Sequence, residues 1–456
     1  MEKINKFKNK SFIFDGAYCF SKPNIKYCFL LGKNGCSIIL EKKLVDSLKL
    51  KSIDEELKFK LIQHGLAHLS NVENRICNNC NSKSLYFIID STKHCNLNCI
   101  YCFRNLNDKR KISKSKLKDV CTYILNVAKS KNIKRINIQM WGGEPLLALD
   151  NIEYVVNFFK DTDIIAKIDI ETNGTLITDK IAKKLHDWNI SIGVSIDGTD
   201  KHQNFQRKLV NGKDSMELVK NGIKNLKKYY KDNLGGITVI TKYNYNDIVE
   251  IIDYYINKLG ISSMKFNIVK DNPNAKERRL GLTLKEVRKF ANKLCDTVEL
   301  YNLLGIPFSE GNIQIRLDNL LERSNFSCCS SNGCKGGETL ISIDINGDIY
   351  PCEMMDYKEV KIGSIYENNK IAAGDSLQKY INLSKNNNIY FKEKNSNKCK
   401  SCPWQYYCKG GCTSRIHYLG NKHNIDIVEC EFNRTVYPRL IDQILKNVSI
   451  NSNKKR

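Results

Sequence analysis

Residues 91–104 read Ser91-Thr-Lys-His-Cys-Asn-Leu-Asn-Cys-Ile-Tyr-Cys-Phe-Arg104, with cysteines at positions 95, 99 and 102. A structural zinc ion or a closed iron-sulfur cube takes four protein ligands. Three thiolates directly after a predicted strand therefore indicate a cluster with one iron left open for a ligand that is not protein. The alternative interpretations are ordinary thiols, or half of a zinc site that is completed elsewhere in the chain.

The spacing of Cys95, Cys99 and Cys102, with an aromatic residue just before the last cysteine, resembles the signature of radical S-adenosylmethionine enzymes. The resemblance implies that the open iron chelates the amino and carboxylate groups of the cofactor's methionine. It also implies that Tyr101 stacks on the adenine of the cofactor.

From about residue 84 to residue 306, short apolar strands alternate with amphipathic helices such as 215–230. This alternation predicts an α/β fold with a parallel sheet, right-handed crossovers and helices on the outer face of the sheet. The six strands are expected at residues 85–90, 136–140, 168–171, 191–196, 237–241 and 264–269. Six units, not eight, resemble the partial (β/α)6 TIM-like barrel of the radical enzymes.

Functional residues of such a sheet belong at the carboxyl ends of its strands. The second strand runs into Trp141-Gly-Gly-Glu-Pro145, where glycines let backbone approach a ligand and Glu144 can accept a hydrogen bond from an ammonium. This segment resembles the family's element that binds the methionine amino group. The resemblance extends to residues expected at the ribose and the methionine carboxylate. The expected cofactor-binding residues are Tyr101, Gly142, Gly143, Glu144, Asn173, Ser195 and Arg207.

Residues 327–436 contain many cysteines and little apolar periodicity, so metal is the simplest means of holding this region together. The spacing is Cys334-x12-Gly347-x4-Cys352 and then Cys399-x2-Cys402-x5-Cys408-x3-Cys412-x17-Cys430. It resembles the SPASM domain of radical enzymes that act on peptides and proteins. That resemblance implies two auxiliary 4Fe-4S clusters, the first held by Cys328, Cys334, Cys352 and Cys412 and the second by Cys399, Cys402, Cys408 and Cys430.

Two questions stay open in this region. Adjacent thiols do not easily serve one cluster corner, so either Cys328 or Cys329 is the ligand. A pair of zinc sites is the alternative to the clusters, because Cys-x2-Cys pairs suit zinc equally well. The pair Cys77-Asn-Asn-Cys80 has no assigned role.

Residues 1–80 are expected to form a small α+β domain. Apolar runs at 12–14, 27–31 and 36–40 predict an antiparallel meander, and 45–50 and 55–64 have helical spacing. This order resembles the small domain with which peptide-modifying enzymes hold the leader of a precursor peptide as an added strand. A plain accessory domain is the alternative. At the other end, residues 437–456 are expected to be a C-terminal tail.

Composition limits the remaining possibilities. The 456 residues predict two or three domains, and the N-terminus shows no apolar signal segment. We therefore expect a cytoplasmic protein with no membrane-spanning segment, in which the abundant cysteines serve as metal ligands in preference to disulfides, eleven of them as assigned above. The net charge of +24 permits binding to nucleic acid, but the lysines are scattered and lack the interleaved aromatics of a single-strand binder.

Together the resemblances imply a radical enzyme with three 4Fe-4S clusters, one catalytic and two auxiliary. It would reductively cleave S-adenosylmethionine to a 5'-deoxyadenosyl radical and modify a ribosomally made, Cys-rich peptide, for example by linking sulfur to carbon. The expected partners are this precursor peptide and an electron donor such as flavodoxin or ferredoxin. The alternatives are formylglycine formation, as in anaerobic sulfatase maturases, and a zinc-dependent nucleic-acid-binding protein.

Glu353, directly after Cys352, is the candidate catalytic residue. In sulfatase maturases the residue at this place is an Asp that resembles a general base, and the Glu here is one methylene longer. A solvated turn residue is the alternative interpretation.

Overall fold

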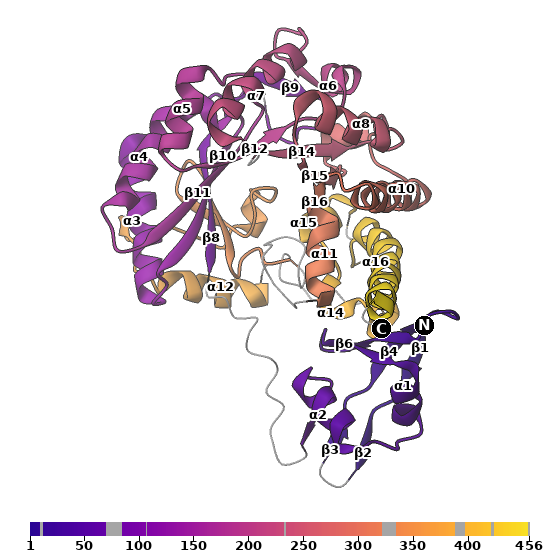
Figure 1. The fold of residues 1–456 in the computed structure, drawn as a ribbon. Coiled ribbons are helices and arrows are strands. Elements are labelled where there is room, and N and C mark those ends of the chain that lie inside the picture. Colours follow the sequence, from indigo (N-terminus) through magenta and orange to yellow (C-terminus); the bar gives the residue numbers. More distant parts are fainter. Residues whose placement is uncertain are drawn as a thin grey trace.

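The computed structural model of the protein describes residues 1–9, 12–69, 84–105, 107–231, 234–321, 334–387, 397–420 and 424–454. Figure 1 shows an open barrel with helices around its outside and a smaller N-terminal domain at some distance from it. Helix α16 (Ile427–Lys454) runs from the barrel to this domain, and the two chain termini lie close together there (Figure 1). The predictions that concern Cys77, Cys80, Cys328 and Cys329 lie outside the described residues.

The barrel is built on a parallel sheet, as predicted. Its strands run in the order β8 (Leu85–Thr92), β10 (Arg135–Gly142), β11 (Ile165–Thr172), β12 (Ser191–Ser195), β14 (Gly235–Ile240), β15 (Ser263–Ile268) and β16 (Ser309–Glu310). The helices on its outer face are α3 (Lys114–Ser130), α4 (Leu149–Lys160), α5 (Asp179–Asp187), α7 (Met216–Tyr230), α8 (Ile248–Tyr254) and α10 (Leu284–Leu303) (Figure 1). All six predicted strands are confirmed, because apolar runs of this length are a local signal.

The cysteine-rich C-terminal region joins the barrel sheet directly. Strand β17 (Leu340–Ile343) pairs in parallel with β8, with Leu340 opposite Tyr86 and Ile343 opposite Ile89. Strands β18 (Asp348–Tyr350) and β19 (Gly363–Ser364) continue the sheet in antiparallel fashion. Because β18 runs antiparallel to β17, the chain leaves β18 near the amino-terminal end of β8 and then returns toward the Cys95 loop, where Asp356 Oδ2 lies 3.1 Å from Lys93 Nζ.

The N-terminal domain contains two small antiparallel sheets. One has the order β1 (Glu2–Ile4), β4 (Ala17–Ser21), β5 (Tyr27–Gly32) and β6 (Ser37–Glu41), and the other has the order β2 (Phe7–Asn9), β3 (Phe12–Phe14) and β7 (Ala67–Leu69). Helices α1 (Lys42–Lys49) and α2 (Glu55–Gln63) complete the domain.

The predicted three-strand meander is wrong in one respect. β5 and β6 pair as expected, but β3 pairs with β2 and β7, and the unpredicted β4 lies beside β5. The chain changes sheet at Gly16, whose φ of +83° favours glycine and whose added Cβ would lie 3.0 Å from the carbonyl oxygen of Ile4.

Helix α16 connects the three regions of the chain. It packs against α10 of the barrel and against β5 of the N-terminal domain. The Tyr437 ring of α16 stacks on Trp404 at 4.8 Å between centroids, and Trp404 in turn stacks on Phe20 of β4 at 5.4 Å. The boundary expected between 436 and 437 therefore falls inside one continuous helix.

The remaining elements are short connectors, apart from α11 and α12. They are β9 (Leu97–Cys99), the 3-10 helix η2 (Pro145–Ala148), α6 (Asp200–Gln206), β13 (Arg207–Leu209), the π-helix η3 (Tyr255–Leu259), α9 (Pro273–Glu277), α11 (Gly311–Leu321), the 3-10 helix η4 (Lys358–Val360), β20 (Tyr366–Glu367), β21 (Lys370–Ile371), α12 (Ser376–Asn387), α13 (Asn397–Lys400), α14 (Gln405–Cys408) and α15 (Thr413–Tyr418). In the part of the chain that the structure describes, no helix has both the length and the apolar character to cross a bilayer.

Candidate active site

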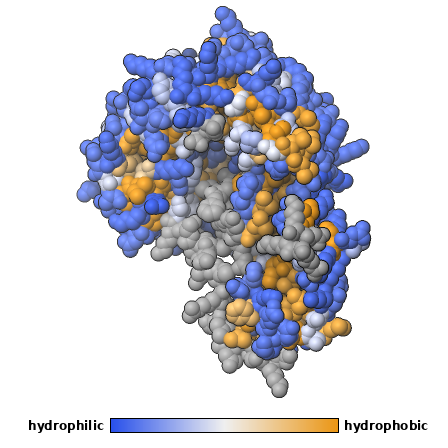
Figure 2. Space-filling model, in the orientation of Figure 1, coloured by the Kyte–Doolittle hydropathy of each residue, from blue (hydrophilic) through white to orange (hydrophobic). Residues whose placement is uncertain are grey.

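A cavity of about 1170 Å³ extends along the inner face of the barrel strands. The visible face of the molecule is largely hydrophilic and is hollowed at the barrel (Figure 2). Most of the predicted site residues line this one cavity. They are Cys95, Cys99, Tyr101, Cys102, Gly142, Gly143, Glu144, Asn173, Ser195, Arg207, Cys334, Cys352, Glu353 and Cys412.

The loop that carries the first three cysteines is fixed by backbone pairing. Strand β9 pairs antiparallel with β13, with Cys99 opposite Arg207, and the Cys102 N–H donates to the Cys99 carbonyl at 3.0 Å. Burial raises the pKa of the Cys95 thiol to about 12 and raises that of Cys99 as well. A bound metal ion reverses this preference and deprotonates its thiol ligands. Three thiols on one cavity-lining loop have the chemistry of the open cluster that the sequence predicts, although among the described residues their side chains are not gathered as tightly as around a single metal ion.

Gly142 and Gly143 let the end of β10 pass close to this loop. The Gly143 N–H donates to the Thr92 carbonyl at 2.8 Å, and the Glu144 N–H donates to the His94 carbonyl at 2.9 Å. A Cβ added at Gly143 would lie 2.3 Å from the His94 oxygen and 2.8 Å from the Cys95 nitrogen. Only a glycine allows the two backbones this approach.

Glu144 and Asn173 are held next to each other on the cavity wall. The Glu144 carboxylate accepts hydrogen bonds from Thr172 Oγ1 at 2.7 Å and from the Asn173 N–H at 2.7 Å. Burial raises its pKa to about 7, against the effect of these donors. The Asn173 side-chain amide donates to Asn96 Oδ1 at 2.8 Å, a partner that the sequence analysis did not single out. A pre-oriented carboxylate of this kind can accept hydrogen bonds from a bound ammonium.

Asp197 organises Tyr101 and Arg207, and its role was missed from the sequence. The Tyr101 hydroxyl donates to Asp197 Oδ2 at 2.5 Å, and Arg207 Nε forms an ion pair with the same oxygen at 3.0 Å. The guanidinium lies 5.4 Å from the centre of the Tyr101 ring. Among the described residues, the buried Arg207 Nε has no aligned hydrogen-bond acceptor. Because Asp197 already faces this nitrogen, the fit to S-adenosylmethionine rests instead on the close glycine backbone at Gly143 and on the oriented Glu144 carboxylate in the same cavity.

The C-terminal cysteines form two groups. Cys334, Cys352 and Cys412 line the barrel cavity, where the Cys352 thiol donates to Glu353 Oε2 at 3.1 Å. The second group does not line that cavity, but its thiols lie close enough together to affect one another's ionisation. Burial raises the pKa of the Cys430 thiol, and the nearby Cys402 raises it further. This group comprises Cys399, Cys402, Cys408 and Cys430. The division matches the two expected ligand sets, whose assignment stays a prediction.

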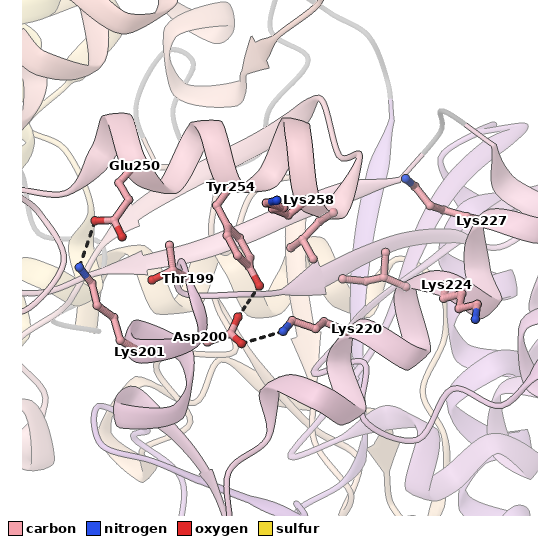
Figure 3. A pocket seen from close by; sticks show the side chains of 11 residues that line it. Thr199, Asp200, Lys201, Lys220, Lys224, Lys227, Glu250, Tyr254 and Lys258 are labelled. Atoms are coloured by element: carbon pink, nitrogen blue, oxygen red, sulfur yellow. Dashed lines mark hydrogen bonds and ion pairs between the residues drawn. The ribbon is translucent and has the colours of Figure 1, made fainter.

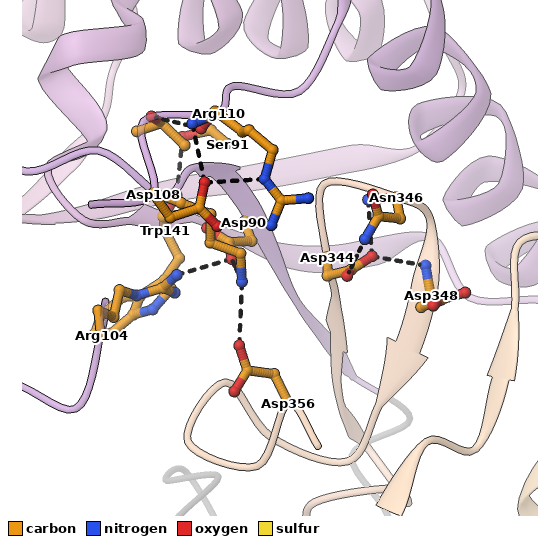
Figure 4. Close-up of polar contacts among 12 residues, drawn as sticks. Asp90, Ser91, Arg104, Asp108, Arg110, Trp141, Asp344, Asn346, Asp348 and Asp356 are labelled. Carbon is orange, nitrogen blue, oxygen red and sulfur yellow. Dashed lines mark hydrogen bonds and ion pairs between the residues drawn. The ribbon is translucent and has the colours of Figure 1, made fainter. Parts of the chain in front are cut away.

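An ion-pair network joins the two cysteine-bearing loops (Figure 4). Asp90 Oδ2 contacts Lys93 Nζ at 2.7 Å and Arg104 Nη1 at 2.9 Å, and Lys93 Nζ also contacts Asp356 Oδ2 at 3.1 Å. Lys93 and Arg104 flank the first three cysteines, whereas Asp356 lies four residues after Cys352. The network therefore fixes the separation between these loops.

A second cavity of about 880 Å³ lies on the outside of the barrel between α6, α7 and α8 (Figure 3). Lysines dominate its lining, and two of them are paired: Lys201 with Glu250 at 3.0 Å and Lys220 with Asp200 at 2.7 Å. None of the predicted site residues lines it.

Two family models match the chain in the predicted order. The model of the radical SAM superfamily matches residues 89–255, and that of the SPASM iron-sulfur cluster-binding domain matches residues 334–403. An uncharacterized protein of Methanocaldococcus jannaschii is 32% identical over 63% of this chain and 90% of its own length.

Two further relatives are named enzymes. The cysteine-type anaerobic sulfatase-maturating enzyme of Clostridium novyi is 27% identical over 79% of this chain and 96% of its own length. The radical SAM cyclopropyl synthase TigE of Paramaledivibacter caminithermalis is 27% identical over 81% of this chain and 76% of its own length.

Solved structures agree with these matches. Native anSMEcpe with bound AdoMet has a TM-score of 0.68 and 25% identity, covering 80% of this chain and 100% of that one. Native anSMEcpe with both AdoMet and the Cp18Cys peptide bound has a TM-score of 0.67 and 25% identity, and the match covers 80% of this chain and 99% of that one. Streptococcus suis SuiB bound to S-adenosylmethionine has a TM-score of 0.55 and 18% identity over 89% of this chain and 99% of that one, which shows a shared fold.

The 32% identity along 90% of the archaeal relative and the two domain matches lead to one conclusion. This chain belongs to the radical SAM superfamily and is an enzyme with a C-terminal SPASM domain, whose cofactors are S-adenosylmethionine and 4Fe-4S clusters.

Proposed function

We propose that this enzyme modifies a ribosomally made, Cys-rich peptide and forms a thioether or another carbon-centred cross-link. The observation that carries the proposal is the single cavity of about 1170 Å³, which the cofactor-binding segments share with Cys334, Cys352, Cys412 and Glu353. Its volume exceeds the roughly 300–1,000 Å³ that holds one drug-sized ligand. There is room for a peptide segment beside the cofactor.

The chemistry and the protein have separate tasks. The reduced catalytic cluster and S-adenosylmethionine, when bound, supply abstraction of a hydrogen atom from an unactivated carbon. Cys95, Cys99 and Cys102 would hold that cluster, and Glu144, Asn173, Ser195 and Arg207 would orient the cofactor. The protein's contribution is to bind, orient and exclude water.

Glu353 is our candidate for the proton acceptor of the reaction. It faces the cavity directly beside Cys352, and its carboxylate is close enough to Glu171, on the opposite wall, to raise the pKa of that buried group further. A general base must come within hydrogen-bond reach of its target. The position between the barrel wall and the SPASM cysteines supports this role.

The N-terminal domain is proposed to hold the leader of the precursor. Among the described strands, β7 lies at the edge of its sheet, to which an extended peptide can add. Two large apolar side chains are exposed near it: Phe59 of the packed helix α2 is 66% exposed, and Leu69 of β7 itself is 47% exposed. Exposed apolar groups beside this edge suit the alternate side chains of a leader.

The test of leader binding is a surface variant, Phe59→Ser with Leu69→Ser. Because both side chains are exposed, we expect the variant to fold and to cleave S-adenosylmethionine without peptide at the wild-type rate, but to bind the precursor at least tenfold more weakly. Leu303→Ser on α10, where the leucine is 80% exposed, is the matched control and should bind normally. Unchanged precursor affinity in the double variant would refute the proposal that the N-terminal domain holds the leader.

Formylglycine formation is the second candidate, favoured by the sulfatase-maturating relative and by anSMEcpe with its Cp18Cys peptide. The products separate the two. A thioether keeps the cysteine sulfur and loses two hydrogen atoms, whereas formylglycine has lost the sulfur and gained an oxygen. We place formylglycine formation second because a leader-binding domain has no role in that reaction.

A further inference from the structure

Lys270 places a positive charge among the SPASM thiols. It follows strand β15 and lines the barrel cavity together with Cys352, Glu353 and Cys412. Its Nζ donates to Ser414 Oγ at 2.8 Å, two residues after Cys412. Among the described residues, no carboxylate oxygen lies within 4.0 Å of this ammonium. A half-buried cation held by a neutral hydroxyl lacks the anionic partner that buried charges ordinarily have.

The neighbouring cation is different, because it is already neutralised. Arg415 forms a buried ion pair with Asp426 at 3.1 Å and donates to the carbonyls of Val269 and Ile268. Arg415 therefore has its anion and its acceptors within the protein. Lys270, by contrast, has no carboxylate within 4.0 Å in the part of the chain that the structure describes.

Ser414 places this ammonium next to a cysteine of the expected cluster. Its Oγ accepts a hydrogen bond from Lys270 Nζ at 2.8 Å and lies 3.3 Å from Cys412 Sγ. Cys352 and Glu353 line the same cavity. One hydroxyl group therefore separates the cation from a sulfur of this group.

We propose that Lys270 is the counter-charge of the auxiliary cluster assigned to Cys334, Cys352 and Cys412, and that its ammonium raises the reduction potential of that cluster. The inference rests on the ligand set of the proposed function. Reduction adds one negative charge to a cluster, so a cation within the same low-dielectric wall stabilises the reduced state more than the oxidised state. Lys270 acts through the cluster and is a tuning residue, not a catalytic one.

The second cysteine group provides a matched comparison. Burial raises the pKa values of Cys402 and Cys430, and the nearby cation Arg434 opposes that rise in both, but the Arg434 side chain is exposed. Water and salt screen an exposed charge far more than one in a cavity wall. Removing the Arg434 charge should therefore have a smaller effect on its cluster.

The test is an anaerobic redox titration followed by electron paramagnetic resonance, without peptide or S-adenosylmethionine. In Lys270→Met we expect one cluster to become harder to reduce. At the wild-type midpoint potential, its ratio of reduced to oxidised cluster should fall about tenfold, which corresponds to a midpoint potential lower by about 59 mV. Lys270→Arg should keep the wild-type midpoint. Arg434→Met should shift its own cluster by less.

Every variant must contain as much iron and acid-labile sulfide as the wild-type protein. If Lys270→Met loses iron, Lys270→Gln, which keeps a donor for Ser414 and removes the charge, is titrated in its place. An unchanged midpoint in a fully loaded neutral variant overturns the proposal, as does an equal shift of all clusters. Because no peptide is present, either result leaves the proposed substrate class standing and is distinct from its failure.

Discussion

The replacement Gly143→Ala tests whether close backbone approach is what fixes the catalytic cluster loop. The added Cβ would lie 2.3 Å from the His94 carbonyl oxygen. Since C···O contacts are normally about 3.3 Å or longer, one of the two backbones must move by about 1 Å. The contacted atoms are backbone atoms of His94 and Cys95, so no flexible side chain can turn aside.

A displacement of this size at reacting groups costs about 100-fold in rate. We therefore expect Gly143→Ala to cleave S-adenosylmethionine about 100-fold more slowly, measured as 5'-deoxyadenosine formed with dithionite in the absence of peptide. Gly235→Ala in β14 is the matched control. The nearest atom to its Cβ lies 3.8 Å away, which is ordinary contact, so the rate should stay at the wild-type value. Wild-type cleavage by a Gly143→Ala protein with full iron would refute the reasoning.

Three other outcomes are expected. Replacing Cys95, Cys99 and Cys102 together with Ala should abolish cofactor cleavage and lower the iron content from about twelve to about eight atoms per chain, and retained cleavage would exclude this loop as the cluster site. Glu353→Gln should leave 5'-deoxyadenosine formation without peptide intact and slow product formation about 100-fold, whereas a wild-type product rate would show that Glu353 is not the base. Asp197→Ala should destabilise the protein by about 3–5 kcal/mol in denaturant unfolding, because it leaves a buried arginine unpaired; a change below about 1 kcal/mol would contradict that pairing.

Local patterns in the sequence predicted most of the barrel and placed the segments expected to bind the cofactor at the ends of its strands. The six strands are continuous apolar runs, and Trp141-Gly-Gly-Glu-Pro145 follows its strand directly, so both signals lie within a few residues. The structure brings the predicted cofactor-binding residues to one cavity because parallel strands present their carboxyl ends together.

Contacts between distant segments could not be predicted in the same way. The pairing of β17 with β8 joins segments about 255 positions apart, and no periodicity specifies it. The sequence did not single out Asp197, because its importance arises from the meeting of Tyr101 and Arg207 in space. The link from Lys93 to Asp356 is of the same kind, since an isolated lysine in a lysine-rich chain carries no signal of its partner.

The most direct test of peptide modification uses a Cys-rich precursor peptide carrying deuterium on carbon. The peptide is incubated with the enzyme, S-adenosylmethionine and dithionite, and both products are analysed by mass spectrometry. The account predicts one deuterium in 5'-deoxyadenosine per modified peptide, and a peptide that has lost two hydrogen atoms while keeping its sulfur. Deuterium-free 5'-deoxyadenosine, or a peptide that has exchanged its sulfur for oxygen, would contradict it.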